Sequence, residues 1–215
     1  MNSFDGYNHL KLVEHYTNCF LRHGDTHEGV DWPNLKDLVK RYEVMLGLVR
    51  GDSQCSLLDF GCGTAMLYQH ILNQGLEHIH YSGLDLGSEY VSAASAKFPS
   101  VAFHEVDILK DPEKAPKADY IVMNGVLTEK QSLSFDEMWA YSQALLPLIF
   151  QKCNIGMAFN VMSKAVDWER EDLFHMPLDL LTRFLVDKVS RHFIIRNDYD
   201  LYEYTVYVYK KPWQK

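Results

Sequence analysis

The feature that most constrains this chain is an apolar run that leads directly into two closely spaced glycines and then into a helical pattern. The stretch is Leu57-Leu58-Asp59-Phe60-Gly61-Cys62-Gly63-Thr64-Ala65. Glycines allow a positive φ and let a ligand approach the backbone closely, while the start of a helix favours a bound carboxylate or phosphate. This order predicts the first strand, turn and helix of an open α/β sheet, with a ligand at the carboxyl end of the strand.

Two other glycine-rich motifs fit this stretch poorly. A dinucleotide-binding turn has the pattern G-x-G-x-x-G, and the position of its third glycine holds Met66. A phosphate-binding loop needs Gly-Lys followed by Ser or Thr, and the sequence has no such tripeptide. An NAD-dependent oxidoreductase is therefore disfavoured, although it stays open as a hypothesis.

Beyond residue 55, β-rich and helical patterns alternate along the chain. The expected strands are 56–59, 80–86, 101–108, 119–126, 155–162, 192–199 and 203–210. The expected helices are 66–72, 89–97, 134–151 and 177–189. Ser88 is expected to cap the second of these helices, and Ser134 with Glu137 to form a capping box on the third.

Such alternation predicts an α/β fold: a Rossmann-like, doubly wound sheet of seven strands, mostly parallel, with a C-terminal antiparallel hairpin. Apolar residues at helical spacing within 10–21 and 35–49 predict two earlier helices. We therefore expect one domain over residues 1–215, in which 51–215 form the ligand-binding core and 1–50 a helical cap over the site.

The stretch from Asp59 to Ala65 matches the glycine-rich first motif of the class I S-adenosylmethionine (SAM)-dependent methyltransferases, and the chain resembles this family over most of its length. The family usually has glycine where this chain has Ala65. The resemblance implies SAM as cofactor and S-adenosylhomocysteine (SAH) as product. It implies that Asp85 accepts the ribose hydroxyls and that Asp107 lies at the adenine. The residues implied for SAM are Asp59, Gly61, Cys62, Gly63, Asp85, Leu86, Asp107, Ile108, Asn124, Gly125 and Val126.

Shorter matches make the chain similar to a small bacterial subgroup of this family that has no assigned acceptor. The matching segments are His23-Gly24, Gly29-Val30-Asp31-Trp32, Ala158-Phe159-Asn160-Val161-Met162-Ser163, Val166-Asp167, Asp172-Leu173-Phe174 and 201–207. The segment after the fourth strand lacks the (N/D)-P-P-(Y/F) pattern of enzymes that methylate exocyclic amines. We expect methyl transfer to a small molecule, at a hydroxyl or carboxyl oxygen. The alternative hypothesis is a protein that binds SAM or another nucleoside without catalysis.

Polar residues in the N-terminal segment and after the fifth strand are candidates for further roles. His175 or His23 is the candidate base, because the ordinary pKa of histidine suits proton removal near neutrality, and Asp167 is a candidate to orient it. Arg22 is a candidate partner of the SAM carboxylate or of an anionic acceptor, and Tyr16 is expected to cover the methionine end. The candidates for substrate binding are Asn160, Ser163 and Arg196.

Composition and the remaining motifs limit the kinds of partner and ligand that the chain is expected to bind. The 21 Lys and Arg against 29 Asp and Glu leave a net charge of −8, which argues against a nucleic-acid or anionic-membrane binder. Residues 1–20 have no basic and apolar signal-peptide pattern, so we expect a cytoplasmic protein. The four cysteines and ten histidines show no zinc-binding spacing, so we expect no metal site. The oligomeric state is not predicted.

Overall fold

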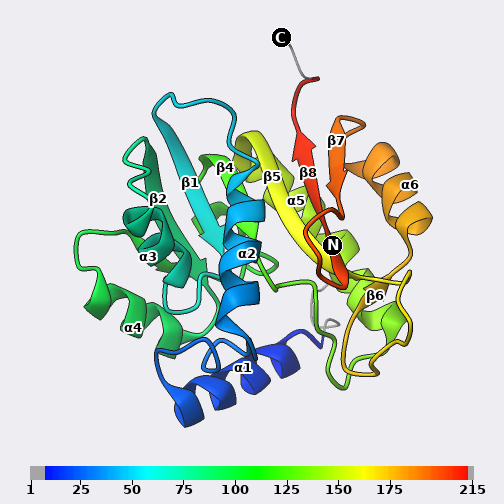
Figure 1. The fold of residues 1–215 in the computed structure, drawn as a ribbon, viewed down its shortest axis with the longest axis horizontal. Helices are drawn as coiled ribbons and strands as arrows, with labels where there is room; N and C mark the ends of the chain where they lie inside the picture. The colour runs from blue at the N-terminus through cyan, green and yellow to red at the C-terminus, as the bar shows by residue number, and fades with distance from the viewer. Residues whose placement is uncertain (1–7, 213–215) are drawn as a thin grey trace.

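The computed structural model describes residues 8–212, and its centre is one mixed sheet with the order β3-β2-β1-β4-β5-β8-β7 (Figure 1). The strands are β1 (Cys55–Phe60), β2 (Ile79–Asp85), β3 (Phe103–Glu105), β4 (Ala118–Met123), β5 (Cys153–Ser163), β6 (His175–Met176), β7 (Phe193–Arg196) and β8 (Glu203–Tyr209). The strands from β1 to β5 run parallel, and β8 lies antiparallel between β5 and β7. The predicted Rossmann-like sheet with a C-terminal antiparallel hairpin is therefore confirmed.

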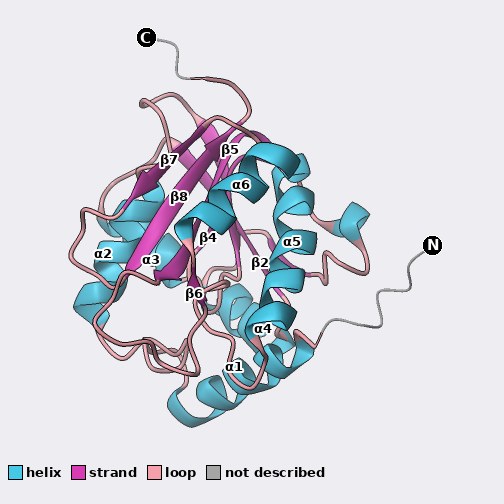
Figure 2. Cartoon of the chain, turned by 90° about the vertical axis from the view of Figure 1, so that its right-hand side faces the viewer, coloured by secondary structure: helices cyan, strands magenta, loops and turns pink. Residues whose placement is uncertain are grey.

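Helices cover both faces of this sheet (Figure 2). They are α1 (Leu10–His23), α2 (Leu35–Leu46), α3 (Met66–Asn73), α4 (Ser88–Lys97), α5 (Phe135–Lys152) and α6 (Leu178–Lys188), with a 3₁₀ turn η1 (Pro112–Lys114). Apolar side chains of α2 and α3 form one core cluster with the sheet, and those of α5 and α6 form the other. No helix within residues 8–212 is long and apolar enough to cross a membrane.

The first two helices lie differently with respect to the sheet. The helix α1 crosses beyond the carboxyl ends of the parallel strands (Figure 1), whereas α2 buries Leu38, Tyr42 and Met45 against a face of the sheet. The side chain of Asn34 begins α2 by accepting the backbone N–H groups of Lys36 and Asp37. The segment between the two helices is therefore brought next to the ends of β1 and β2.

Several local predictions differ from the structure. The predicted cap Ser88 is the first helical residue of α4, because Gly87 takes the cap position and the Ser88 hydroxyl donates to Glu89 instead. The strand predicted over 101–108 shrinks to β3, since the carboxylate of Asp107 accepts the backbone N–H of Leu109 in a turn. The fourth strand ends at Met123, and β6 was not predicted. The capping box of Ser134 and Glu137 is confirmed.

Candidate active site

A pocket opens at the carboxyl ends of the parallel strands, where the loops after β1, β2 and β4 meet α1. Every residue that the sequence implied for SAM lines it except Arg22. These residues are Tyr16, Asp59, Gly61, Cys62, Gly63, Asp85, Leu86, Asp107, Ile108, Asn124, Gly125 and Val126. The sequence analysis did not assign the other polar and aromatic wall residues, among them His9, Asp31, Trp32, Thr128, Glu129 and Tyr141.

The carboxylate of Asp85, at the end of β2, is held by backbone donors on both sides. Its Oδ2 accepts the N–H of Gly63 at 2.8 Å, and its Oδ1 accepts the N–H of Gly87 at 2.9 Å. Burial raises the pKa of Asp85, while these backbone hydrogen bonds lower it. A carboxylate has about four acceptor positions, so each oxygen retains capacity for one ligand hydroxyl.

The glycine-rich turn after β1 depends on backbone conformations that suit glycine. Gly61 and Gly63 have φ of +77° and +51°, and a Cβ on Gly63 would lie 2.8 Å from Cγ1 of Val30. The turn is thus packed beneath the segment that follows α1. Ala65, which replaces the usual glycine of the related family, adopts φ +58° and is buried in the core rather than in the pocket wall.

Asp107 forms the next part of the wall with a histidine that the sequence analysis missed. His9 Nε2 lies 3.3 Å from Asp107 Oδ2, and the His9 ring stacks on Tyr141 with 5.3 Å between centroids. His9 is 6% exposed, and its Nδ1 is buried without a hydrogen-bond partner among the described residues. This part of the wall therefore combines the ring faces of His9 and Tyr141 with the polar groups of His9 and Asp107.

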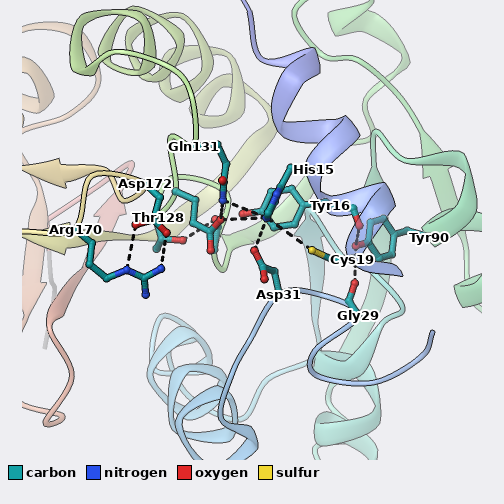
Figure 3. Close-up of polar contacts among 12 residues, drawn as sticks. His15, Tyr16, Cys19, Gly29, Asp31, Tyr90, Thr128, Gln131, Arg170 and Asp172 are labelled. Carbon is teal, nitrogen blue, oxygen red and sulfur yellow. Dashed lines mark hydrogen bonds and ion pairs between the residues drawn. The ribbon is translucent and has the colours of Figure 1, made fainter. Parts of the chain in front are cut away.

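The hydroxyl of Tyr90 connects α4 to α1 and to the segment that follows α1. The Oη of Tyr90 lies 2.7 Å from the carbonyl oxygens of both Tyr16 and Gly29 (Figure 3). Tyr16 therefore lies over the pocket with its backbone anchored. Burial, followed by the charge of Glu129, raises the pKa of the Tyr16 hydroxyl well above its ordinary value.

A polar cluster lies beside Tyr16 (Figure 3). His15 Nε2 is 2.6 Å from Asp31 Oδ2 and 3.7 Å from Glu129 Oε2, and the amide of Gln131 contacts both His15 and Glu129. Burial, together with the charge of Asp31, raises the pKa of Glu129 to about 8. Asp31 and Glu129 both line the pocket, so this cluster forms its acidic side.

Several known proteins are similar to this chain in sequence or in fold. Residues 58–140 match a protein family described as a methyltransferase domain. The chain is 28% identical over 166 residues to Rv1506c of Mycobacterium tuberculosis, whose name describes it as a methyltransferase; the match covers 76% of this chain and 98% of that protein. An uncharacterized methyltransferase of Halobacillus halophilus, YrrT, is 31% identical over 48% of this chain and 47% of its own length.

Among solved structures, a magnesium protoporphyrin IX methyltransferase from Synechocystis with bound SAM is similar over 97% of this chain and 100% of its own. The TM-score is 0.64 and the identity 16%, which shows a shared fold. A human N-acetylserotonin methyltransferase in complex with SAM is similar over 94% of this chain and 65% of its own, with a TM-score of 0.59 and 15% identity. The matched domain, the named relatives and the shared fold together support a class I SAM-dependent methyltransferase.

Asn160 does not line the pocket but supports its wall. The side chain is fully buried on β5; its oxygen accepts the N–H of Gly125 at 2.8 Å, and its nitrogen donates to Glu203 at 3.0 Å and toward Asn124 at 3.4 Å. Glu203, also fully buried, pairs with Arg41 of α2 at 2.8 Å. The predicted substrate residue is thus part of a network that positions the loop after β4.

His175 is likewise engaged within the protein. Its Nδ1 lies 2.6 Å from the carbonyl oxygen of Ser163, and its Nε2 accepts the backbone N–H of Arg170 at 3.2 Å. The ring is 4% exposed and does not line the pocket. The hydroxyl of Ser163 accepts the N–H of Ala165. Both side chains organise the segment that follows β5.

The remaining candidates lie on the surface of the chain, away from the pocket wall. Arg22 and His23 occupy the exposed last turn of α1, where His23 lies 3.5 Å from Glu28. Asp167 is exposed in the loop after β5. Arg196 pairs with Asp198 at the end of β7. The structure therefore does not bring these four side chains together with the residues around Asp85.

Proposed function

We propose that the chain binds SAM in this pocket and transfers its methyl group to a hydroxyl oxygen of a small molecule. The observation that carries the SAM assignment is the Asp85 carboxylate, which two backbone N–H groups hold at the carboxyl end of β2. Its free acceptor capacity fits the adjacent hydroxyls of a ribose. A carboxylate in this position favours a nucleoside over a phosphate, which it would repel.

The walls on either side of Asp85 support the same placement. Leu86 and Ile108 provide apolar surface for an adenine, and the Asp107 carboxylate beside them is an acceptor for its amino group. In the other direction the turn at Gly61 and Gly63 leads toward Tyr16, where the methionine part would lie. No Lys or Arg between residues 8 and 212 lines the pocket, so backbone N–H groups would hold the methionine carboxylate.

The acceptor would approach from the side of Asp31 and Glu129, next to Tyr16. An acidic wall without a Lys or Arg side chain from residues 8–212 favours a neutral, hydroxyl-bearing molecule over a carboxylate or a phosphate, because the Asp31 carboxylate would repel an anion across a partly buried wall. SAM, when bound, supplies a positively charged methyl donor that reacts by direct displacement. The residues of this chain contribute by aligning the acceptor and by excluding water.

Calorimetry tests the cofactor assignment, with SAM, SAH and NADH titrated into the full chain. We expect heat with SAM and SAH and none with NADH. Transfer of label from SAM to a panel of sugars, nucleotide-sugars, organic acids and peptides then tests the acceptor. Label on a hydroxyl compound supports the proposal. Label only on organic acids or peptides contradicts the acceptor class, and SAM binding with no transfer across the panel favours the non-catalytic alternative.

A further inference from the structure

A second group of side chains next to the pocket has the composition of a metal site. His15 and Cys19 are four residues apart on α1, so they project from the same side of the helix. Asp31, which lies beside His15 in Figure 3, comes from the segment before α2. Glu129 comes from the segment after β4. Ligand atoms of His15, Cys19 and Asp31 all lie within 4.8 Å of one another.

The distances fit the coordination sphere of a small divalent cation. His15 Nε2 is 3.7 Å from Cys19 Sγ, 3.7 Å from Glu129 Oε2 and 2.6 Å from Asp31 Oδ2. Zinc bonds of standard length in a tetrahedron place nitrogen and sulfur donors roughly 3.6 Å apart, and nitrogen and oxygen donors roughly 3.4 Å apart. Two of the three separations are already close to these values, and the third requires only a small movement of Asp31.

The charges of the group also favour a cation. The carboxylates of Asp31 and Glu129 both lie near Nε2 of His15, and their side chains are 31% and 15% exposed. Partly buried carboxylates that share one neighbour are stabilised by a counter-charge, and proteins commonly supply a metal ion for this purpose. The imidazole and thiol select for a borderline cation rather than Mg²⁺ or Ca²⁺, which prefer oxygen ligands. The partial exposure of His15 and Asp31 gives a cation a route of entry.

We propose that His15, Cys19 and Asp31 bind a divalent cation of the zinc class at the mouth of the methyltransferase pocket, with Glu129 beside His15 as a further carboxylate. Asp31 and Glu129 belong to the pocket wall as well as to this group. A cation held there lies where an acceptor hydroxyl would approach and would bind its oxygen. This last step rests on the proposed function, whereas cation binding itself does not.

Cobalt(II) is the probe for the test, because a thiolate ligand gives a charge-transfer band in the near ultraviolet. Chelator-treated, tag-free full-length protein is titrated with Co²⁺ and then with Zn²⁺. We expect one saturable cobalt site per chain with a thiolate band, and displacement of the cobalt by zinc. Cys19→Ser should remove the band, and His15→Ala and Asp31→Asn should weaken binding at least tenfold.

His80→Ala is the matched control, because His80 is an exposed histidine on β2 and belongs to a different part of the fold from this group. It should bind cobalt as the parent does, and thermal unfolding should show that each variant is folded. The absence of a saturable site, the absence of the thiolate band, or unchanged binding in His15→Ala would each overturn the proposal. SAH calorimetry on metal-free protein separates the two questions, since loss of SAH binding tests the methyltransferase pocket and leaves the cobalt result unaffected.

Discussion

The side-chain oxygen of Asn160 lies 2.8 Å from the backbone nitrogen of Gly125 and accepts its hydrogen bond. The same side chain donates to the buried carboxylate of Glu203, which Arg41 of α2 also holds. Strand β5, strand β8 and helix α2 are thereby joined to the loop that forms one wall of the pocket. The position of Gly125 is thus set by residues that lie outside the pocket wall.

The first prediction concerns Asn160→Ala. The change leaves the N–H of Gly125 without this partner, and a buried unsatisfied group costs about 1–3 kcal/mol. Oε1 of Glu203 loses one donor and keeps the Tyr199 hydroxyl at 3.4 Å. We expect the free energy of unfolding to fall by about 1–3 kcal/mol in urea denaturation, and SAH to bind more weakly. Asn154→Ala is the control, since Asn154 is an exposed residue of the same strand that donates to Asp119. Equal effects in the two variants would refute a positioning role for Asn160.

The second prediction concerns Asp85→Ala. Loss of hydrogen bonds between a carboxylate and two ribose hydroxyls should weaken SAM and SAH by about 1.5–3 kcal/mol, the range for hydrogen bonds to a charged group. Calorimetry measures this directly. Asp111→Ala removes an exposed carboxylate that pairs with Lys114 and should leave affinity unchanged. If Asp85→Ala binds SAH as tightly as the parent, the ribose assignment is wrong.

The third prediction is a pH dependence of stability caused by Asp59. This side chain is 3% exposed and accepts the Tyr81 hydroxyl at 2.8 Å. Burial raises its pKa from 3.8 to about 7, against the opposing effect of the Tyr81 hydrogen bond. Between these two values the folded chain binds a proton that the unfolded chain has lost. The stability from this group is therefore complete below about pH 4, falls as pH rises to 7, and changes little above that.

Asp59→Asn provides the measurement. The amide has no proton to lose, so the difference in unfolding free energy between parent and variant should shift in favour of the variant by a few kcal/mol between about pH 4.5 and pH 8. Urea denaturation at several pH values gives both curves. A difference that stays constant with pH would show that Asp59 titrates normally.

The fold, and the residues that line the pocket around Asp85, could be predicted from local sequence patterns. The residues from Asp59 to Gly63 belong to the end of β1 and the turn that follows it. Asp85 is the last residue of β2. Such a unit is visible in a short window, because strand ends at one edge of a parallel sheet converge. The length of β3 was harder to predict, since the hydrogen bond from Leu109 to Asp107 forms a turn within an apolar strand pattern.

The side of the pocket formed by Asp31 and Glu129 could not be predicted in the same way. Asn160 and His175 were selected for their chemistry, but burial and internal partners, which the sequence does not display, give them positioning contacts. His15, Asp31 and Glu129 come from three separate segments that meet only in the folded chain. The four-residue spacing of His15 and Cys19 was the one local signal of this group. It indicates that the two side chains share one side of a helix, but it does not reveal that Asp31 and Glu129 lie beside them. The proposed metal site differs from the expectation, drawn from the sequence, that the chain has no metal site.

The fourth prediction concerns Gly63→Ala. The residue has φ +51°, and the new methyl group would lie 2.8 Å from Val30. The variant must keep a left-handed backbone, which costs about 1 kcal/mol, and must also displace the segment that covers the turn. We expect SAH affinity to fall at least tenfold. Gly51→Ala is the matched control, because Gly51 has φ +74° and a methyl group there would meet nothing within 4 Å. This variant should lose a similar free energy of unfolding from its left-handed backbone and should retain the affinity of the parent for SAH. Equal affinities in the two variants would contradict this role.

The fifth prediction concerns Tyr90→Phe. The hydroxyl of Tyr90 contacts the carbonyl oxygens of Tyr16 and Gly29 at 2.7 Å and so fastens α1 and the following loop to α4. Without it, the free energy of unfolding should fall by about 1 kcal/mol. Amide hydrogen exchange should accelerate in α1 and in residues 24–32 more than in β1 or β4, because the covering elements open locally.

Affinity for SAH should also fall several-fold in Tyr90→Phe, since the covering elements must become ordered when the ligand binds. Tyr68→Phe is the control, because Tyr68 stacks on Tyr81 with 4.8 Å between ring centroids and packs against Phe98, contacts that its ring keeps without the hydroxyl. It should match the parent in exchange and in affinity. Uniform acceleration of exchange across the sheet in Tyr90→Phe would instead show that the hydroxyl supports the whole fold and not the cover over the pocket.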